Sequence, residues 1–146
     1  MFWTHDPLAG RDRDVHLAWG SPDGRRWTAP RGTGLPGQHC QPIPLGGGRL
    51  VAVYARRQDP PGIHAALSRD FGATWDAGSD VVVYDSTAGT ELGASGARAI
   101  GDYWDDMVAW RFGHPRGVAL PTGEIVVVYY AGDDLAKSVR WARLTV

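Results

Sequence analysis

The chain has 146 residues, 43% of them hydrophobic, and a formal net charge of −1. This length allows one ordinary domain with a hydrophobic core, and the composition excludes a chain that is disordered throughout. The near-neutral charge excludes the strongly basic surface that nucleic acid or an anionic membrane attracts, so neither is expected as a partner.

The start of the chain, MFWTHDPLAGRDRD, has no basic region followed by an apolar one, so no signal peptide is predicted. The cellular location stays open between the cytoplasm and export of a protein with further N-terminal sequence. The apolar run at 125–131 is far too short for a transmembrane helix. Cys40 is the single cysteine, which excludes an internal disulfide.

The predicted strands are short, rich in β-branched and aromatic residues, and separated by Gly, Pro and Asp, whereas helical periodicity is almost absent. In chain order they lie at residues 15–19, 50–55, 63–67, 81–84, 117–120, 125–130 and 139–146. LGGGRL (45–50) and LPTGEI (120–125) are tight turns, each of which predicts a hairpin between a first and a second strand.

These segments repeat. QPIPLGGGRLVAVYARR (41–57) resembles RGVALPTGEIVVVYYAG (116–132), and HLAWGSPDGRRWTAP (16–30) resembles HAALSRDFGATWDAG (64–78). SVRWARLTV (138–146) resembles the apolar starts of the segments 16–30 and 64–78. The spacing of Trp27 and Trp75 fits the roughly 40–50 residue period of a four-stranded propeller blade.

The turn sequences SPDGRRW (21–27) and SRDFGATW (68–75) place a serine, an aspartate, a glycine and a tryptophan in the same order. An Asp side chain in a turn accepts hydrogen bonds from nearby backbone N–H groups, and Gly adopts a positive φ without strain. The Trp is expected to pack beneath the turn, between sheets. We interpret both as structural turns, not catalytic sites. Their defining residues are Ser21, Asp23, Gly24, Trp27, Ser68, Asp70, Gly72, Thr74 and Trp75.

SRDFGATW is similar, position for position, to the Asp-box of BNR-repeat proteins, the sialidase-like family, and SPDGRRW resembles its form shorter by one residue. The resemblance covers nearly the whole chain, which is similar to the C-terminal portion of such a protein. It implies an all-β fold, a partial six-bladed β-propeller of about two and a half four-stranded antiparallel blades. The expected single incomplete domain spans 1–146. Its blade boundaries are near 1–34, 35–85 and 112–146, with a long inter-blade loop at 86–111.

The resemblance also implies a glycoside hydrolase that acts on terminal sugars of glycans, sialic acid above all. The alternative is a non-catalytic BNR-repeat propeller that binds carbohydrate or protein, and an arabinanase-type hydrolase is a weaker third hypothesis. Family sialidases bind the sugar carboxylate with three arginines and use a Tyr–Glu nucleophile pair and an Asp acid/base. The Arg-Ile-Pro motif of the first arginine is absent from this chain, and no catalytic residue is assigned.

In such a propeller, loops alternate between two faces, and the candidate ligand residues share the face opposite to the Asp-box turns. Arg56 and Arg57 end a predicted strand there, and guanidinium groups bind carboxylates in a bidentate way. Two solvated strand-end charges are the alternative. The substrate-binding candidates are His5, Asp6, His39, Arg56, Arg57, Asp59, Trp104, Asp105, Asp106, Trp110 and His114.

The loop GDYWDDMVAWRFGHP (101–115) offers tryptophan faces for sugar stacking and carboxylates for hydroxyl bonds or acid/base chemistry. Equally, its tryptophans can plug the gap between blades while the aspartates face solvent. No metal or other cofactor is expected, because His39 and Cys40 lack ligand spacing and Gly46–Gly48 reads as a hairpin turn. The expected partners are a glycan or small sugar and, through open propeller edges, further copies of the chain.

Overall fold

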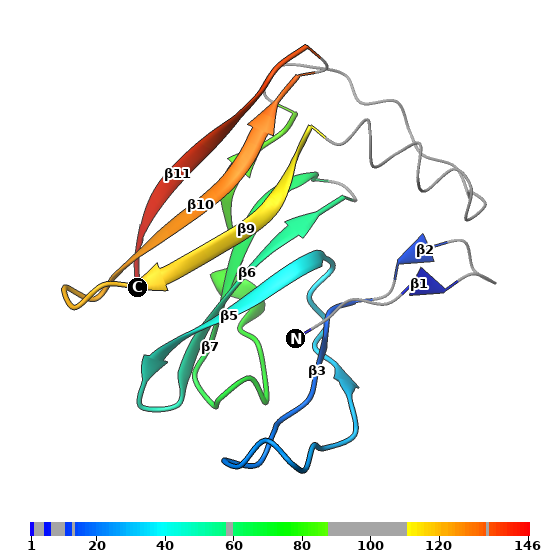
Figure 1. Cartoon of the computed structure of the whole chain (residues 1–146), viewed down its shortest axis with the longest axis vertical. Helices are drawn as coiled ribbons and strands as arrows, with labels where there is room; N and C mark the ends of the chain where they lie inside the picture. Colours follow the sequence, from blue (N-terminus) through cyan, green and yellow to red (C-terminus); the bar gives the residue numbers. More distant parts are fainter. Residues whose placement is uncertain (2–4, 7–10, 13, 58–59, 88–110, 134) are drawn as a thin grey trace.

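The computed structural model describes residues 1, 5–6, 11–12, 14–57, 60–87, 111–133 and 135–146. Within these ranges the protein is all-β and its sheets are antiparallel, as Figure 1 shows. The helical content of the described residues is one short 3₁₀ turn, η1 (Ala77–Ser79). None of the described helical segments is long and apolar enough to cross a membrane.

The larger sheet has four strands in sequential order: β5 (Gln38–Gly46), β6 (Arg49–Arg56), β7 (Gly62–Ser68) and β8 (Val81–Asp85). Its β6 and β7 read as continuous apolar runs because both of their faces are buried. The β5–β6 hairpin turns through three successive glycines with positive φ, the conformation that glycine adopts without strain.

The second sheet has three strands, β9 (Phe112–Ala119), β10 (Glu124–Gly132) and β11 (Lys137–Thr145), in the order β11-β10-β9. Along β10, buried and more exposed residues alternate, so one face of this sheet is turned to the core. Two short pairs complete the described structure: β1 (His5–Asp6) with β2 (Arg11–Asp12), and β3 (His16–Leu17) with β4 (Arg31–Gly32).

The main core lies between the two larger sheets, which pack face to face with β9 alongside β5 (Figure 1). From β6 it takes Val51 and Val53, and from β10 it takes Ile125 and Val127. A second cluster covers the opposite face of the four-stranded sheet, where Tyr54 of β6 packs with Val15 and Leu35 from the N-terminal part of the chain. The four-stranded sheet is therefore the central layer of the described structure.

Both predicted hairpins are confirmed, because β5 pairs with β6 and β9 with β10. The strand predicted at residues 15–19 is only His16–Leu17, and the other boundaries differ most at two places. β5 begins at Gln38 and β9 at Phe112, so the starts of both strands lie where loops were expected. Each strand contains a register shift near its start, at His39 and at His114, which have φ of 46° and 48°. These β-bulges interrupt the alternation from which strands are predicted, and pairing resumes beyond them.

The expected bonds from backbone N–H groups to the two turn aspartates are present. The Thr74 amide donates to Asp70 Oδ1 over 2.8 Å, and the Arg25 amide donates to Asp23 Oδ1 over 3.1 Å. Ser68 Oγ donates to Asp70 and accepts from the Gly72 amide, which closes the longer turn. The carboxylate thus holds the turn as a structural group.

The expectation that both turn tryptophans are buried plugs is wrong for Trp27. Trp75 is partly buried and packs on the cluster of Val15 and Leu35, between the N-terminal segment and the four-stranded sheet. Trp27 is 67% exposed and lies over Gly20, with its Nε1 donating to the Gly24 carbonyl. The physical difference is the neighbouring layer, because Trp75 packs on the second core cluster whereas Trp27 belongs to neither core cluster of the described residues.

Candidate functional site

The candidate residues gather at one end of the two larger sheets, where β6 and β10 finish and β5 and β9 begin. We call it the arginine end, after Arg56, Arg57 and Arg111. The register of both sheets places the two glycine-containing hairpins and the 68–75 turn at the opposite end. The described candidates His39, Arg56, Arg57 and His114 therefore lie at the end opposite to the 68–75 turn.

His39 and His114 form a ring pair at this end. Their centroids are 4.3 Å apart with an interplanar angle of 45°, and each lies in the bulge near the start of its own strand. The two residues occupy equivalent positions in the sequence repeat, two residues before Gln41 and Arg116. The Tyr130 ring of β10 lies 5.7 Å from that of His114. The repeat thus brings two imidazoles and a phenol together where the first strands of both sheets begin.

His39 is neutral at physiological pH. Burial, the largest cause, and the neighbouring His114, Arg57 and Arg116 together lower the pKa of its imidazole to about 4. A neutral imidazole offers one N–H donor and one acceptor nitrogen, which suits hydrogen bonding to a hydroxyl group.

Arg57 links the two sheets. Its Nη1 donates to the Phe112 carbonyl over 2.7 Å, and its guanidinium lies 4.4 Å from the centroid of the Phe112 ring. A Cβ added at Gly113 would lie 2.9 Å from both Arg57 Nη2 and Tyr130 Oη, so glycine lets these groups approach the backbone. Arg57 is therefore more than a solvated charge at the end of a strand. Arg56 is the half-buried last residue of β6.

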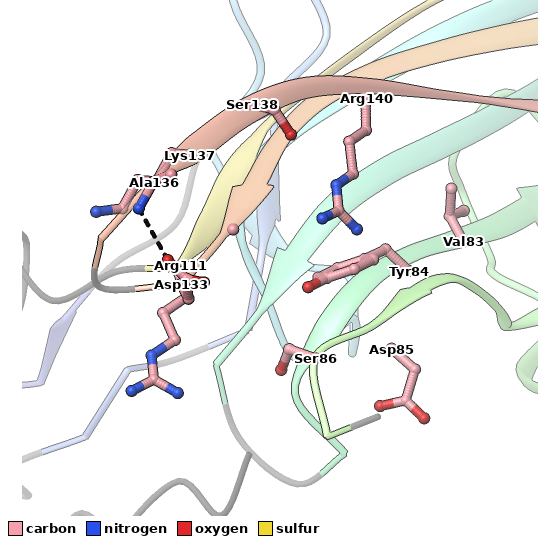
Figure 2. Close-up of a pocket in the computed structure, with 11 residues that line it drawn as sticks. Val83, Tyr84, Asp85, Ser86, Arg111, Asp133, Ala136, Lys137, Ser138 and Arg140 are labelled. Carbon is pink, nitrogen blue, oxygen red and sulfur yellow. Dashed lines mark hydrogen bonds between the residues drawn. The ribbon is translucent and has the colours of Figure 1, made fainter. Parts of the chain in front are cut away.

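A pocket of about 750 Å³ opens between the end of β8 and the turn that joins β10 to β11 (Figure 2). Three cationic side chains line it: Arg111, Lys137 and Arg140. The Arg140 guanidinium lies 5.5 Å from the centroid of the Tyr84 ring, so an aromatic face and a cation border the same space.

The two acidic residues of the pocket are engaged by their own turns. Asp133 Oδ1 accepts the amides of Leu135 and Ala136, which lowers the pKa of its carboxyl group. Asp85 Oδ1 accepts the amide and the hydroxyl of Thr87. Because these carboxylates hold turns, the pocket is a better site for an anion than for a cation.

The structure brings together three of the sequence-predicted candidates, His39, Arg57 and His114, with Arg56 beside them. His5 and Asp6 lie in β1, whose backbone is described while their side chains are not. The other candidates fall outside the described residues: Asp59, Trp104, Asp105, Asp106 and Trp110.

Sequence reasoning missed Tyr130, Arg111, Lys137 and Arg140. Arg111, Tyr130 and Lys137 stand at or near strand ends on the same side as Arg56, so the predicted strand order contained a signal for them, whereas Arg140 is the fourth residue of β11. The position of a residue in a strand, however, does not tell whether its side chain lines a pocket or points into solvent. Only the packing of β8 beside the β10–β11 hairpin creates the pocket.

A buried polar network was also missed. Tyr54 Oη donates to Asp80 Oδ1 over 2.7 Å, and His64 Nδ1 lies 3.2 Å from Asp80 Oδ2. His64 is 1% exposed, and its Nε2 lies 3.2 Å from the Pro60 carbonyl. The partners of Tyr54 and His64 lie just before β7 and β8, so we interpret this trio as a structural element that ties these segments to the four-stranded sheet.

The described residues contain no group of three or more His, Cys, Asp or Glu side chains placed to hold a metal ion. Burial raises the pKa of the Cys40 thiol to about 12, and its Sγ lies 3.7 Å from Met1 Sδ. This thiol stays protonated at neutral pH and is a poor nucleophile and metal ligand.

No protein-family model matches this chain, and no curated protein matches it either. The case for a function therefore depends on the residues and their geometry.

Proposed function

We propose that this chain is part of a sialidase-like glycoside hydrolase and binds terminal sugars that carry a carboxylate, such as sialic acid. The observation that carries the proposal is the gathering of cationic side chains at the arginine end. Arg56 and Arg57 finish β6, and Arg111, Lys137 and Arg140 line the neighbouring pocket. The chain as a whole has a net charge of −1, so this local excess of cations is a feature of one end.

The proposal also concerns the fold of the chain. The two larger sheets would be successive blades of a partial six-bladed propeller. Three observations support it: their hairpins repeat in sequence, they pack face to face, and their first strands lie side by side. In that arrangement the arginine end is the ligand face.

Each chemical part of a sialic acid has a matching group at this end. A guanidinium binds a carboxylate through parallel N–H donors, the Tyr84 and Tyr130 rings offer apolar faces, and the neutral His39 imidazole can bond a hydroxyl. The pocket volume of about 750 Å³ is within the range of small-molecule sites.

Hydrolysis is the less supported half of the proposal. Glycosidases use two positioned carboxyl groups or a tyrosine nucleophile with its base. The described carboxylates of the pocket, Asp85 and Asp133, are held in turns, and the lowered pKa of Asp133 makes it a poor general acid. This specific observation favours the second candidate function, a non-catalytic propeller of the same family that binds carbohydrate or protein.

The deciding experiment is a titration of the isotope-labelled chain with a methyl sialoside, followed by heteronuclear NMR. Shifts are expected for the amides of Arg111 and Lys137, and methyl galactoside, which lacks the carboxylate, is expected to bind much more weakly. The double variant Arg111→Ala, Lys137→Ala should weaken sialoside binding by about tenfold, the loss expected for a charge-assisted hydrogen bond. Arg25→Ala is the matched control, because Arg25 is exposed and lies at the opposite end.

Equal binding of both sugars, or full affinity in the double variant, would place any sugar site elsewhere. Turnover of a fluorogenic sialoside separates the two candidate functions. Weak or no turnover with retained binding supports the non-catalytic propeller. Robust turnover by this chain would contradict the inference drawn from Asp85 and Asp133.

A further inference from the structure

His64 of β7 is buried between two hydrogen-bond acceptors. Its side chain is 1% exposed, its Nε2 lies 3.2 Å from the Pro60 carbonyl, and its Nδ1 lies 3.2 Å from Asp80 Oδ2. The other carboxylate oxygen of Asp80 accepts the Tyr54 hydroxyl over 2.7 Å. A neutral imidazole carries one N–H donor and one acceptor nitrogen. It therefore supplies a donor to only one of the two oxygens that face it.

Both contacts of His64 are hydrogen bonds only when the ring and Asp80 together hold one additional proton. Nε2 must be protonated, because a peptide carbonyl only accepts. The additional proton then lies between Nδ1 and Asp80 Oδ2, on either atom. Without it, two lone pairs would face each other over 3.2 Å at a buried position, where polar atoms without partners are costly. The geometry of the trio therefore fits a protonated His64–Asp80 pair.

The Pro60 carbonyl belongs to a segment that also holds the wall of the pocket. The next carbonyl, that of Pro61, accepts the Ser86 amide over 3.2 Å and the Ser86 hydroxyl over 2.9 Å. Ser86 follows β8 and lines the pocket, as Figure 2 shows. Two consecutive carbonyls thus connect the buried His64 to a residue of the pocket wall.

We propose that His64 is a pH-sensitive switch: loss of the additional proton as the pH rises releases the Pro60 carbonyl and loosens the contact between Pro61 and Ser86 at the pocket wall. The proton that stays on the ring is held by Nδ1, because a hydrogen bond to a carboxylate is about twice as strong as one to a neutral group. Nε2 then turns a lone pair towards the Pro60 carbonyl. Pro60 is exposed, so its carbonyl can bond water instead. The switch belongs to the chain without ligand and does not depend on the proposed sugar binding.

The surroundings of the trio leave the switch to His64 and Asp80. The other charged or titratable groups that face it from the described residues are Tyr54 and Arg56 of β6, Cys40 of β5 and the amino group of Met1. Burial raises the pKa of the Tyr54 hydroxyl well above its usual range and that of the Cys40 thiol to about 12, so both groups stay protonated. Arg56 stays a cation. A contribution of the Met1 amino group would persist in a variant of Asp80, which separates the two.

NMR of the ¹⁵N-labelled chain without ligand, from about pH 5 to about pH 9, tests the proposal. Nε2 of His64 is expected to be protonated at the acidic end and unprotonated at the alkaline end. Hydrogen exchange of the Ser86 amide should accelerate over this range by about tenfold more than that of the β10 amides, because its acceptor loosens. Nε2 that stays protonated at the alkaline end would overturn the proposal, as would a Ser86 amide whose exchange follows that of β10 throughout.

Asp80→Asn should abolish the pH dependence while keeping the bonds. The new amide oxygen can still accept the Tyr54 hydroxyl, and the amide N–H can donate to Nδ1 of a neutral imidazole whose Nε2–H bonds Pro60 at every pH. Asp76→Asn is the matched control, since Asp76 is exposed, precedes Asp80 in the same segment and accepts the Gly78 amide. It should behave like the unmodified chain.

Circular dichroism checks that both variants fold, and the titration of the unmodified chain decides the proposal by itself. A Ser86 response that persists unchanged in folded Asp80→Asn would overturn it, because another group would then control the contact.

Discussion

The side-chain amide of Gln41 pairs with the backbone of Gly117 in both directions. Nε2 donates to the Gly117 carbonyl over 3.1 Å, and the Gly117 amide donates to Oε1 over 2.9 Å. Gln41 lies on β5 and Gly117 on β9, the first strands of the two larger sheets. A glutamine side chain thus takes the place of a neighbouring strand and fixes how the two sheets, and with them the arginine end, are aligned.

Gln41→Leu should lower the free energy of unfolding by about 1–3 kcal/mol, because it leaves the amide and the carbonyl of Gly117 without their partner. Urea unfolding followed by tryptophan fluorescence measures this change. Arg49→Ala, at an exposed position, is the control and should stay within about 0.5 kcal/mol of the unmodified chain. A Gln41→Leu variant as stable as the control would show that the pair contributes little.

Gly117→Ala should destabilise the fold for a different reason. A Cβ at this position would lie 2.5 Å from Ile43 Cδ1, so the two sheets would have to move apart or Ile43 would have to change rotamer. Overpacking of this kind costs about 1–3 kcal/mol.

The same contact provides its own control, since Ile43→Val removes the clashing methyl group. The double variant should be more stable than the sum of the two single changes predicts, by an interaction energy of at least about 0.5 kcal/mol. Simple additivity in urea unfolding would indicate that the loss in Gly117→Ala arises elsewhere.

The elements that the sequence predicted correctly are those whose signals are local. Three glycines predict the β5–β6 turn, and the Ser–Asp–Gly order around Asp70 predicts its backbone bonds, since every partner lies within a few residues. The burial of Trp27 was predicted from the same local pattern and is wrong, because burial depends on a neighbouring layer.

The candidate site was predicted in part for the same physical reason. Arg57 was selected as a strand-end cation, but its contact with Phe112 joins residues 55 positions apart. The His39–His114 pair depends on two bulges with positive φ, for which single-strand periodicity has no signal. The pocket beside Arg140 exists only through the packing of two sheets.

Asp70→Ala should lower the melting temperature at neutral pH, and the difference from the unmodified chain should disappear in acid. Hydrogen bonds from the Thr74 hydroxyl and amide lower the pKa of Asp70 from 3.8 to about 2. Because the folded-state pKa is the lower one, the ionised carboxylate stabilises the fold above pH 4, and this contribution is lost between about pH 4 and pH 2. Thermal melts of both proteins across this interval measure it. A constant difference down to pH 2 would mean that the ionised form has no special role in the turn.

The last prediction concerns His39, whose pKa is lowered to about 4 chiefly by burial. Between about pH 6.5 and pH 4 the unfolded chain binds a proton at this imidazole that the folded chain does not, so stability falls as the pH falls through this interval. The imidazole is partly exposed, which limits the effect to the order of 1 kcal/mol. His39→Asn should remove this part of the pH dependence while keeping the positive φ of the bulge, since asparagine tolerates that conformation. Urea unfolding at pH 7 and pH 4.5 measures the difference, and NMR of the imidazole protons measures the pKa directly. An imidazole that titrates near pH 6.5 would show that His39 is not buried against His114 and Arg57, and this part of the pH dependence of stability would then be absent.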